Sequence, residues 1–205
     1  MCSQGAEQDL RSTITEILSN PPFDVTKVST KTGNIPPGAK ENGGIFLHPN
    51  PWAIIAETIL GDGDQAFTYY QRINPAAKNE SIDEYECEPY CYAQNILSNE
   101  HPNFGLGRNS WLSGTSSWTY QASTKYILGI SPEHSGLRID PCIPKAWKNF
   151  EVTRTCRGCI YKISVTNKSG SSKGVKSIKF DGKEINGTIV PWQTDKKEHT
   201  VEVEM

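Results

Sequence analysis

The strongest constraint on the fold is a change of sequence pattern after Gly129. Before this residue, apolar side chains recur at helical spacing, most clearly in residues 52–73. After it, short Val- and Ile-rich segments such as residues 159–166 alternate apolar and polar side chains, and pairs such as Asp181-Gly182 separate them as turns. We therefore predict an α+β chain in which helices come first and an antiparallel sheet with one wet face follows.

The helical part divides into four predicted segments. Their ranges are 7–19, 52–60, 62–73 and a helix that follows Ser117 and closes at Gly129. The apolar positions predict the buried face of the second helix as Trp52, Ile55, Ala56, Ile59 and Leu60, and that of the fourth as Trp118, Ala122 and Tyr126. We place a domain boundary after these helices, with one domain at 1–135 and a sheet domain at 136–205.

Residues 74–114 join the helices without a clear helical or strand period. The segment YECEPYCYAQN within them alternates polar and apolar side chains, which predicts an extended stretch with polar groups on one side. A loop of this length is either functional or disordered, and its aromatic residues argue against disorder.

Charge and hydropathy exclude two classes of partner. The net charge is −2 and the hydrophobic share is 36%, so we expect neither nucleic-acid binding nor a membrane surface as a partner. No apolar run is long enough to span a bilayer. The first residues show no basic segment followed by an apolar one, and we therefore expect no secretory signal and a cytoplasmic location.

The six cysteines do not make a metal site by sequence reasoning. Cys156 and Cys159 have the spacing of a zinc-ligand pair, and Cys87 with Cys91 could supply a second pair. On one straight strand, however, Cys156 and Cys159 would face opposite sides. We therefore expect reduced thiols and no metal.

Gly38 to Trp52 is the densest mixture of charged, apolar and glycine residues in the chain. Lys40 and Glu41 stand close to an apolar trio and to His48. This mixture predicts the wall of a pocket for a polar ligand, and the alternative is an irregular loop with a capping histidine. The run SGTSS from Ser113 similarly predicts an anion site at a helix N-terminus, or ordinary N-capping.

Several motifs in one order carry a family resemblance. KENGGIFLHPNPW, EPYCYAQN, RNSWLSGTSSW, YILGI and LRIDPCIP together resemble the C-terminal part of glycoside hydrolase family 94, whose members include cellobiose and N,N'-diacetylchitobiose phosphorylases. The resemblance covers residues 36–205. It implies the last helices of an (α/α)6 barrel followed by a jelly-roll-like β-sheet domain.

The resemblance also implies a reaction and a set of residues. Family members cleave a disaccharide with inorganic phosphate and invert the anomeric centre, using one carboxylic acid and no cofactor. By the resemblance, His48, Ser113 and Gly114 hold phosphate. Gln94, Lys40, Glu41 and Ile35 contact the sugars, and the aliphatic Ile35 favours an N-acetylated sugar. We expect the His48 ring to lie on the order of 5–8 Å from the Gly114 backbone, with the anion between them.

The family's catalytic acid, a phosphate-binding arginine and most of the barrel lie N-terminal to the matched motifs. We therefore expect a C-terminal fragment with no catalytic residue of its own, whose partner is the missing N-terminal half. Full-length family members are expected to be homodimers. The competing hypothesis is a non-catalytic carbohydrate-binding or structural module, which would display an exposed aromatic platform built from residues such as Trp147, Tyr161 and Trp192.

Overall fold

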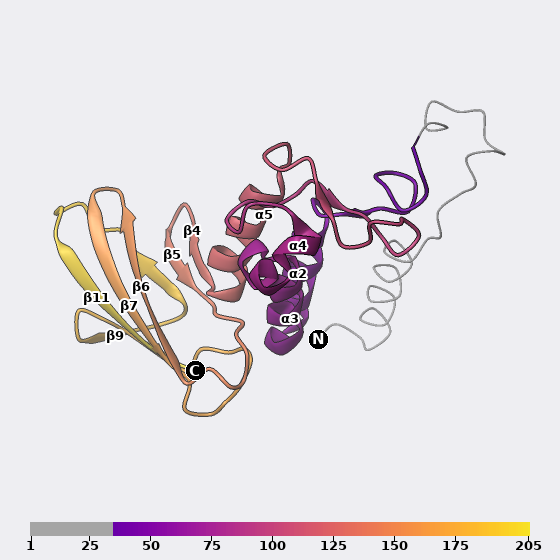
Figure 1. The fold of residues 1–205 in the computed structure, drawn as a ribbon. Helices are drawn as coiled ribbons and strands as arrows, with labels where there is room; N and C mark the ends of the chain where they lie inside the picture. Colours follow the sequence, from indigo (N-terminus) through magenta and orange to yellow (C-terminus); the bar gives the residue numbers. More distant parts are fainter. Residues whose placement is uncertain (1–34) are drawn as a thin grey trace. The chain divides into compact units, whose positions relative to one another are not determined.

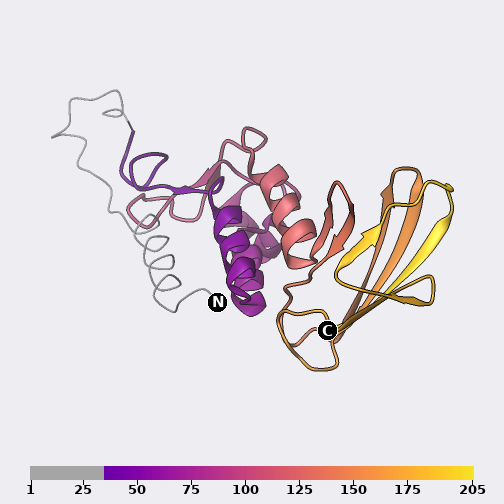
Figure 2. The same cartoon turned by 180° about the vertical axis from the view of Figure 1, so that it is seen from behind.

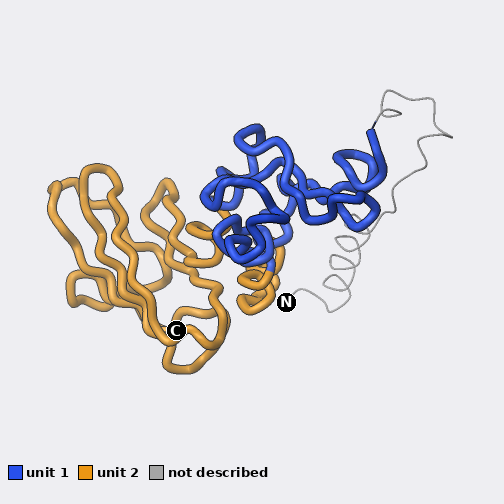
Figure 3. Tube along the Cα trace, in the orientation of Figure 1, with its two compact units in different colours: residues 1–54, 69–120 blue, residues 55–68, 121–205 orange. Residues whose placement is uncertain are grey.

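The computed structural model describes residues 35–205, which form two compact units. The described part of the first unit comprises residues 35–54 and 69–120, and the second unit comprises residues 55–68 and 121–205 (Figure 3). The predicted helix at 7–19 lies outside the described residues. The mixture of helices and mostly antiparallel sheets confirms the α+β class, while the boundary predicted after residue 135 stays a prediction (Figure 1).

The first unit is built around a small sheet. Its three strands, β1 (Ile45–Phe46), β2 (Asn95–Ile96) and β3 (Gly107–Arg108), pair antiparallel in the order β1-β2-β3. Between β1 and β2 lie the 3-10 helix η1 (Pro75–Ser81) and the short helix α4 (Ile82–Tyr85). The predicted alternation holds on either side of a turn at Pro89 and Tyr90: Tyr85, Cys87, Cys91, Ala93 and Asn95 are buried, whereas Pro89 is exposed.

Two helices run through both units, and their limits follow local signals. Helix α2 (Asn50–Leu60) ends at Gly61, whose φ of 87° suits glycine. Helix α3 (Gly63–Ile73) begins where the Asp62 carboxylate accepts a hydrogen bond from the Gln65 N–H at 3.0 Å. Both helices lie close to their predicted ranges.

The predicted buried face of α2 is wrong. Trp52 and Ile59 are 49% and 65% exposed, whereas Ile54, Glu57 and Thr58 are buried. The helix is apolar around most of its circumference, so the 3.6-residue period did not select one face.

The predicted stripe of the fourth helix is also wrong at two of its three positions. Ala122 is fully buried, but Trp118 and Tyr126 are 38% and 37% exposed. The helix starts as α5 (Thr115–Gln121) and continues as the π-helix η2 (Ala122–Ile127), where the Leu128 N–H bonds the carbonyl five residues back. The wider turn displaces the i, i+4 pattern that the prediction assumed.

The second unit contains two sheets, seen from both sides in Figures 1 and 2. One holds β4 (Ile130–Pro132), β5 (Gly136–Ile139) and β10 (Ile189–Pro191) in the order β10-β5-β4. The other has the order β6-β7-β11-β8-β9, with strands Asn149–Cys156, Cys159–Thr166, Glu198–Glu204, Ser177–Phe180 and Lys183–Ile185.

The core of this unit follows the predicted alternation in β7. Tyr161, Ile163 and Val165 are buried, and Lys162 between them is exposed. The Tyr161 ring packs edge-on against Trp192 at 6.1 Å, and its hydroxyl accepts a hydrogen bond from the Gln193 N–H at 3.0 Å. These contacts join β7 to the segment that follows β10.

One strand pair contradicts the prediction of a purely antiparallel sheet. β11 runs parallel to β7 over seven residue pairs, while every other described pair is antiparallel. β11 reaches β7 only after the chain has passed through β8, β9 and β10, and such a return can arrive in either direction. Asp181-Gly182 is the predicted hairpin turn, whereas β9 and β10, on either side of Asn186-Gly187, pair with different strands.

Cys156 and Cys159 are arranged differently from the prediction. They flank the two-residue turn Arg157-Gly158 and stand directly opposite each other on β6 and β7. Opposed residues on neighbouring strands point to the same face. The prediction that they face opposite sides is therefore wrong, because residues 149–166 form a hairpin and not one straight strand.

A glycine after η2 allows a close backbone approach in the second unit. Gly129 has a φ of 68°, and its carbonyl accepts a hydrogen bond from the Asp140 N–H at 2.8 Å. A Cβ here would overlap the backbone of Asp140 and Pro141. Gly182 has a similar φ of 77° but nothing within 4 Å of its Cβ position.

We expect Gly129→Ala to destabilise the second unit by about 2–5 kcal/mol, since left-handed strain and overpacking add. Gly182→Ala is the matched control and should cost about 1 kcal/mol from strain alone. Urea denaturation of the two variants measures both values. Equal losses would show that the close approach at Gly129 does not matter.

Candidate active site

His48 lies in the tight connection between β1 and α2. Hydrogen bonds fix both sides of it: the Leu47 N–H donates to the Gln94 carbonyl at 2.9 Å, and the Asn50 side-chain amide donates to the Phe46 carbonyl at 2.7 Å. Leu47 is 1% exposed and anchors the loop, whereas His48 is half-buried. The sequence pattern of an apolar anchor followed by a histidine therefore places an accessible imidazole on a fixed backbone.

The His48 ring packs directly on Gly114. A Cβ added to Gly114 would stand 2.8 Å from the ring atom Nδ1 and closer still to Cε1. The ring also packs edge-on against Trp52 at 5.6 Å, and Trp52 packs edge-on against Trp118 at 5.7 Å. Glycine is thus required at position 114 for this arrangement, because any side chain would occupy the space of the imidazole.

Ser113 and Gly114 form the turn that starts α5. The Ser113 Oγ accepts a hydrogen bond from the Thr115 N–H at 3.0 Å and shares a short hydrogen bond with the Thr115 hydroxyl. The Gly114 carbonyl accepts the first helical bond, from the Trp118 N–H at 3.2 Å. Local capping of the kind considered in the sequence analysis is therefore present. The first turn of an α-helix still presents N–H groups that have no acceptor within the helix.

The predicted spacing between His48 and Gly114 needs a correction. We expected a separation that would leave room for an anion between them, but the ring touches the glycine. An anion can approach instead at the ring edge: the ring atom Nε2 lies 3.6 Å from the Cβ position, farther out than Nδ1. From there it could also reach the first N–H groups of α5.

Gln94 is joined to the same turn. Its side-chain amide donates to the Leu112 carbonyl at 3.1 Å, and its backbone N–H donates to the Arg108 carbonyl at 3.0 Å. The residue directly before β2 therefore contacts the residue directly before Ser113. His48, Gln94, Ser113 and Gly114 form one cluster, in which Gln94 adjoins the three residues that the resemblance assigns to phosphate.

Two of the other three predicted sugar contacts lie at a separate pocket of about 390 Å³. Ile35 and Lys40 line it together with Asn95 and Arg108. Glu41 is exposed and is not among the lining residues. The structure thus divides the predicted sugar residues between the pocket and the His48 cluster, and it leaves Glu41 on the surface beside Lys40.

Asn95 is a pocket residue that the sequence analysis did not single out. It is fully buried, yet neither its side-chain nitrogen nor its oxygen has a hydrogen-bond partner among the described residues. A buried amide without partners is costly unless a ligand or water satisfies it. Its place at the end of the EPYCYAQN motif, one residue after Gln94, was the available signal.

Trp52 and Trp118 are also site residues that were misassigned. The helical period put both on buried faces, but both are partly exposed: Trp52 packs against the His48 ring, and Trp118 packs against Trp52. Their proximity in sequence to His48 and to Gly114 was the signal that periodicity masked.

The surrounding titratable groups are held in defined charge states. Burial raises the pKa of Tyr85 and of Tyr92 to about 12, so both phenols are neutral at physiological pH. A hydrogen bond from its own backbone N–H, and then one from the Trp111 indole at 3.0 Å, lower the pKa of the Glu88 carboxyl. The ionised Glu88 thereby ties its loop to the loop that precedes Ser113.

Comparison with known proteins identifies relatives of this chain by sequence. The sequence profile described as "Glycosyl hydrolase 94 superfamily, catalytic domain" matches residues 2–129. N,N'-diacetylchitobiose phosphorylase of Vibrio proteolyticus is 51% identical over 154 residues, which is 75% of this chain and 19% of the relative. The protein of the same name from Vibrio furnissii is 49% identical over 149 residues, covering 73% of this chain and 19% of the relative.

A third relative aligns along the entire chain. Solabiose phosphorylase of Paenibacillus borealis is 33% identical over 207 aligned residues, which cover 100% of this chain and 27% of the relative. The chain thus spans about a fifth to a quarter of the length of these curated relatives. Because the family profile covers more than half of the 205 residues, the chain belongs to glycoside hydrolase family 94.

Proposed function

We propose that this chain is the C-terminal part of an inverting glycoside phosphorylase that cleaves a β-1,4-linked disaccharide with inorganic phosphate. The observation that carries the proposal is the packing of the His48 imidazole on Gly114 at the start of α5. Two relatives that share about half of their aligned residues with this chain bear the name N,N'-diacetylchitobiose phosphorylase. We therefore propose N,N'-diacetylchitobiose as the first substrate to test and cellobiose as the second.

In this proposal, the His48 cluster holds the phosphate. The first turn of α5 supplies N–H groups and the positive end of the helix dipole. The His48 imidazole adds a donor from a second direction, and the Ser113 hydroxyl can add a third. A phosphate held by several fixed donors has few orientations, which brings its attacking oxygen to one place.

The bond changes are those of a single displacement. A phosphate oxygen forms a bond to the anomeric carbon while the glycosidic C–O bond breaks on the opposite face. One carboxylic acid outside the matched motifs gives its proton to the leaving oxygen. Inverting hydrolases need a second carboxylate to activate water, whereas phosphate arrives as an anionic nucleophile, so one acid suffices.

The pocket lined by Ile35, Lys40 and Asn95 is proposed to hold sugar. A sugar ring fits a pocket with one aliphatic wall and a few convergent polar groups. Lys40 offers a donor, and the buried Asn95 amide offers both a donor and an acceptor that lack partners among the described residues. Gln94 and Glu41 are proposed to contact the neighbouring sugar positions.

Exposed apolar residues support the proposal that the helices belong to an (α/α)6 barrel. Trp52 and Trp118 in the first unit, and Ile59 and Tyr126 in the second, are large apolar side chains with substantial exposure on helices. Helices of a complete (α/α)6 barrel would cover such side chains with their neighbours. The sheets of the second unit then correspond to the β-domain that follows the barrel.

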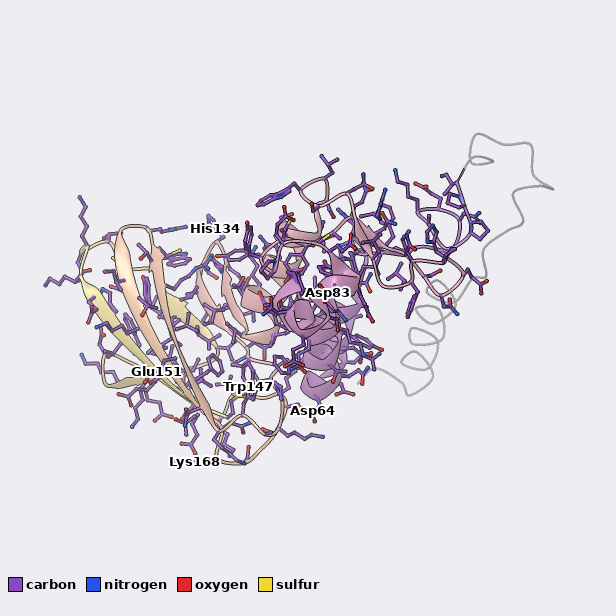
Figure 4. All side chains as sticks on the ribbon, in the orientation of Figure 1. Asp64, Asp83, His134, Trp147, Glu151 and Lys168 are labelled. Carbon is purple, nitrogen blue, oxygen red and sulfur yellow. The ribbon has the colours of Figure 1, made fainter. Side chains whose placement is uncertain are left out.

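The competing proposal of a carbohydrate-binding module lacks its expected surface. Tyr161 is fully buried, and Trp147 and Trp192 are half-buried. Trp147, labelled in Figure 4, packs edge-on against Phe67 at 5.1 Å, and Trp192 packs against Tyr161. These three residues therefore serve the interior of the second unit and do not form an exposed platform.

A chimera tests the proposed function. This chain would replace the segment that it matches in the Vibrio proteolyticus relative, and the chimera would be assayed with N,N'-diacetylchitobiose or cellobiose plus phosphate. We expect release of a sugar 1-phosphate with inverted anomeric configuration. A folded chimera that produces no sugar 1-phosphate, beside an active parent enzyme, would refute the proposal.

Asn95 provides a prediction that separates function from stability. Replacing this unpartnered amide with leucine should stabilise the chain by about 1–2 kcal/mol, because a costly buried polar group disappears. The same change in the chimera should raise KM for the disaccharide. Denaturant unfolding and steady-state kinetics measure the two effects.

The control for this prediction is Asn167, which is also fully buried but fully bonded. Its amide donates to the carbonyls of Trp147 and Ser171, and its oxygen accepts from the Ser171 N–H. Asn167→Leu should destabilise the chain by about 2–4 kcal/mol, since it leaves these backbone groups unpaired. Destabilisation by Asn95→Leu of the same size would mean that Asn95 has a structural role.

A further inference from the structure

Three potential metal ligands converge in the second unit, in a cluster that takes no part in the proposed phosphorolysis. Cys159 begins β7, Asp195 precedes β11, and His199 lies on β11. One thiol sulfur, one carboxylate oxygen and one imidazole nitrogen from these residues lie within 4.8 Å of one another. Cys159 and His199 are buried, and Asp195 has 41% of its side chain exposed, which leaves a route for an ion.

The separations of these atoms match the dimensions of a zinc site. His199 Nε2 lies 3.0 Å from Asp195 Oδ1, and Cys159 Sγ lies 3.6 Å from the same oxygen. Zinc bonds of about 2.0 Å to nitrogen and oxygen and about 2.3 Å to sulfur place neighbouring tetrahedral ligands about 3.3–3.6 Å apart. The two separations from Asp195 Oδ1 therefore lie within a few tenths of an ångström of the values that tetrahedral zinc requires, and the thiol sulfur and the imidazole nitrogen lie within 4.8 Å of each other.

The histidine is oriented as metal-bound histidines usually are. Its other ring nitrogen, Nδ1, lies 2.8 Å from Asp181 Oδ2, and the second oxygen of Asp181 accepts the Thr200 N–H at 2.8 Å. A carboxylate that accepts a hydrogen bond from Nδ1–H keeps the proton on Nδ1, and the Nε2 lone pair is then free to bind a metal. The rings of Tyr161 and Phe180 pack against the imidazole, with centroids at 5.7 and 5.4 Å.

A second thiol lies beside the first. Cys156 stands opposite Cys159 across the Arg157-Gly158 turn, so both side chains point to the same face of the hairpin. Both cysteines are free thiols. Two thiolates, one imidazole and one carboxylate form a donor set that favours zinc over calcium or magnesium.

We propose that Cys159, Asp195 and His199 bind a zinc ion, and that the Cys156 thiol, which stands outside this three-residue cluster, turns toward the ion as its fourth ligand. Four protein ligands make a closed, structural site. The ion would connect the β6–β7 hairpin to the segment that leads into β11, and so secure the parallel pair β7–β11. The proposal does not depend on the phosphorylase function. The alternative is that the cluster binds no metal, with a protonated His199 hydrogen-bonded to Asp181 and Asp195.

The test uses the whole chain, reduced and stripped of metal with a chelator. Zn²⁺ is titrated by calorimetry in competition with a chelator, and Co²⁺ is titrated as an optical probe. We expect one equivalent of Zn²⁺ bound with submicromolar affinity. The Co²⁺ form should show tetrahedral d–d absorption and a thiolate-to-cobalt charge-transfer band. Absence of stoichiometric Zn²⁺ binding to the wild-type chain would overturn the proposal without reference to any variant.

Variants assign the ligands. Cys159→Ser and His199→Gln should weaken Zn²⁺ binding by at least about 100-fold, and Asp181→Asn by about 10–100-fold. Cys156→Ser should weaken it and remove intensity from the charge-transfer band, and unchanged binding would overturn the assignment of Cys156.

Two other buried cysteines serve as matched controls. Cys142→Ala in the same unit and Cys91→Ala in the first unit should leave affinity and spectrum unchanged. Circular dichroism establishes that each variant is folded. Full Zn²⁺ affinity in folded Cys159→Ser or His199→Gln would place the ion elsewhere and refute the site.

Discussion

Gly114→Ala in the chimera is expected to lower kcat/KM for phosphate at least ~100-fold, since an ångström-scale displacement of a positioning group can have this effect. The added methyl group would overlap the His48 ring and push it from the first turn of α5. The helix itself should survive, because alanine is a good helix former. The loss should therefore appear in phosphate kinetics, with little change in stability.

His48→Ala should produce a loss of similar size for a different reason. It leaves Gly114 and the helix intact but removes the imidazole donor, and single donors to a developing anion contribute about 100–1,000-fold in kcat. The matched control is His134→Ala, at the exposed histidine in the β4–β5 turn labelled in Figure 4. A Gly114→Ala chimera with unchanged phosphate kinetics would contradict the assignment of the cluster.

The second large effect concerns the chain by itself. We expect the isolated 205-residue chain to release no detectable sugar 1-phosphate from N,N'-diacetylchitobiose or cellobiose. The resemblance places the family's general acid outside the motifs matched here, and general acid catalysis contributes about 100–10,000-fold on its own. The substrate-binding residues that the family carries outside these motifs would add to this loss of rate.

A coupled assay for the sugar 1-phosphate, with the chimera as positive control, measures this difference. Turnover by the isolated chain within an order of magnitude of the chimera would mean that a proton donor lies among these residues. Glu41 and Glu88 would then be the first carboxyl groups to replace.

The sequence predicted those parts of the fold that local patterns determine. Alternation in residues 159–166 correctly gave the buried face of β7, and Gly61 and Gly129 correctly ended their helices. Local patterns did not predict which strands pair when they lie far apart in the sequence. The parallel contact of β11 with β7 depends on the path of the intervening chain, which no short-range period encodes.

Two errors arose because a single helical or strand period was applied across a point where the secondary structure changes. The stripe through Trp118 and Tyr126 assumed one helical type, but the helix widens into a π-helix. The assignment of Cys156 and Cys159 to opposite faces assumed one strand, but a turn lies between them. Both errors hid candidate site residues, since Trp118 supports the His48 environment through Trp52, and Cys159 adjoins His199.

The motif resemblance predicted which residues lie in the His48 cluster. It did not predict how these residues are arranged. The motifs identified His48, Ser113 and Gly114 as partners, and the structure places the three together. The direct contact of ring and glycine was not predicted, because the expected spacing placed the anion between them. Asn95 was missed because an asparagine in a strand gives no sign of being unpartnered until its neighbours are known.

The most direct test of the central claim is a phosphate titration of the whole chain followed by NMR. The probes are the backbone amides of Gly114 and Ser116 and the ring nitrogens of His48, with chloride at equal ionic strength as the control. A few charge-assisted hydrogen bonds to phosphate are partly offset by the free energy that association costs. We therefore expect a dissociation constant for phosphate of roughly 1 mM.

We predict that the Gly114, Ser116 and His48 signals shift together with one dissociation constant, and that His48→Ala weakens the response of the two amides. His134→Ala should leave that response unchanged. If these signals stay in place up to about 100 mM phosphate, the binding free energy is weaker than about 1.4 kcal/mol. The His48 cluster is then not a phosphate site.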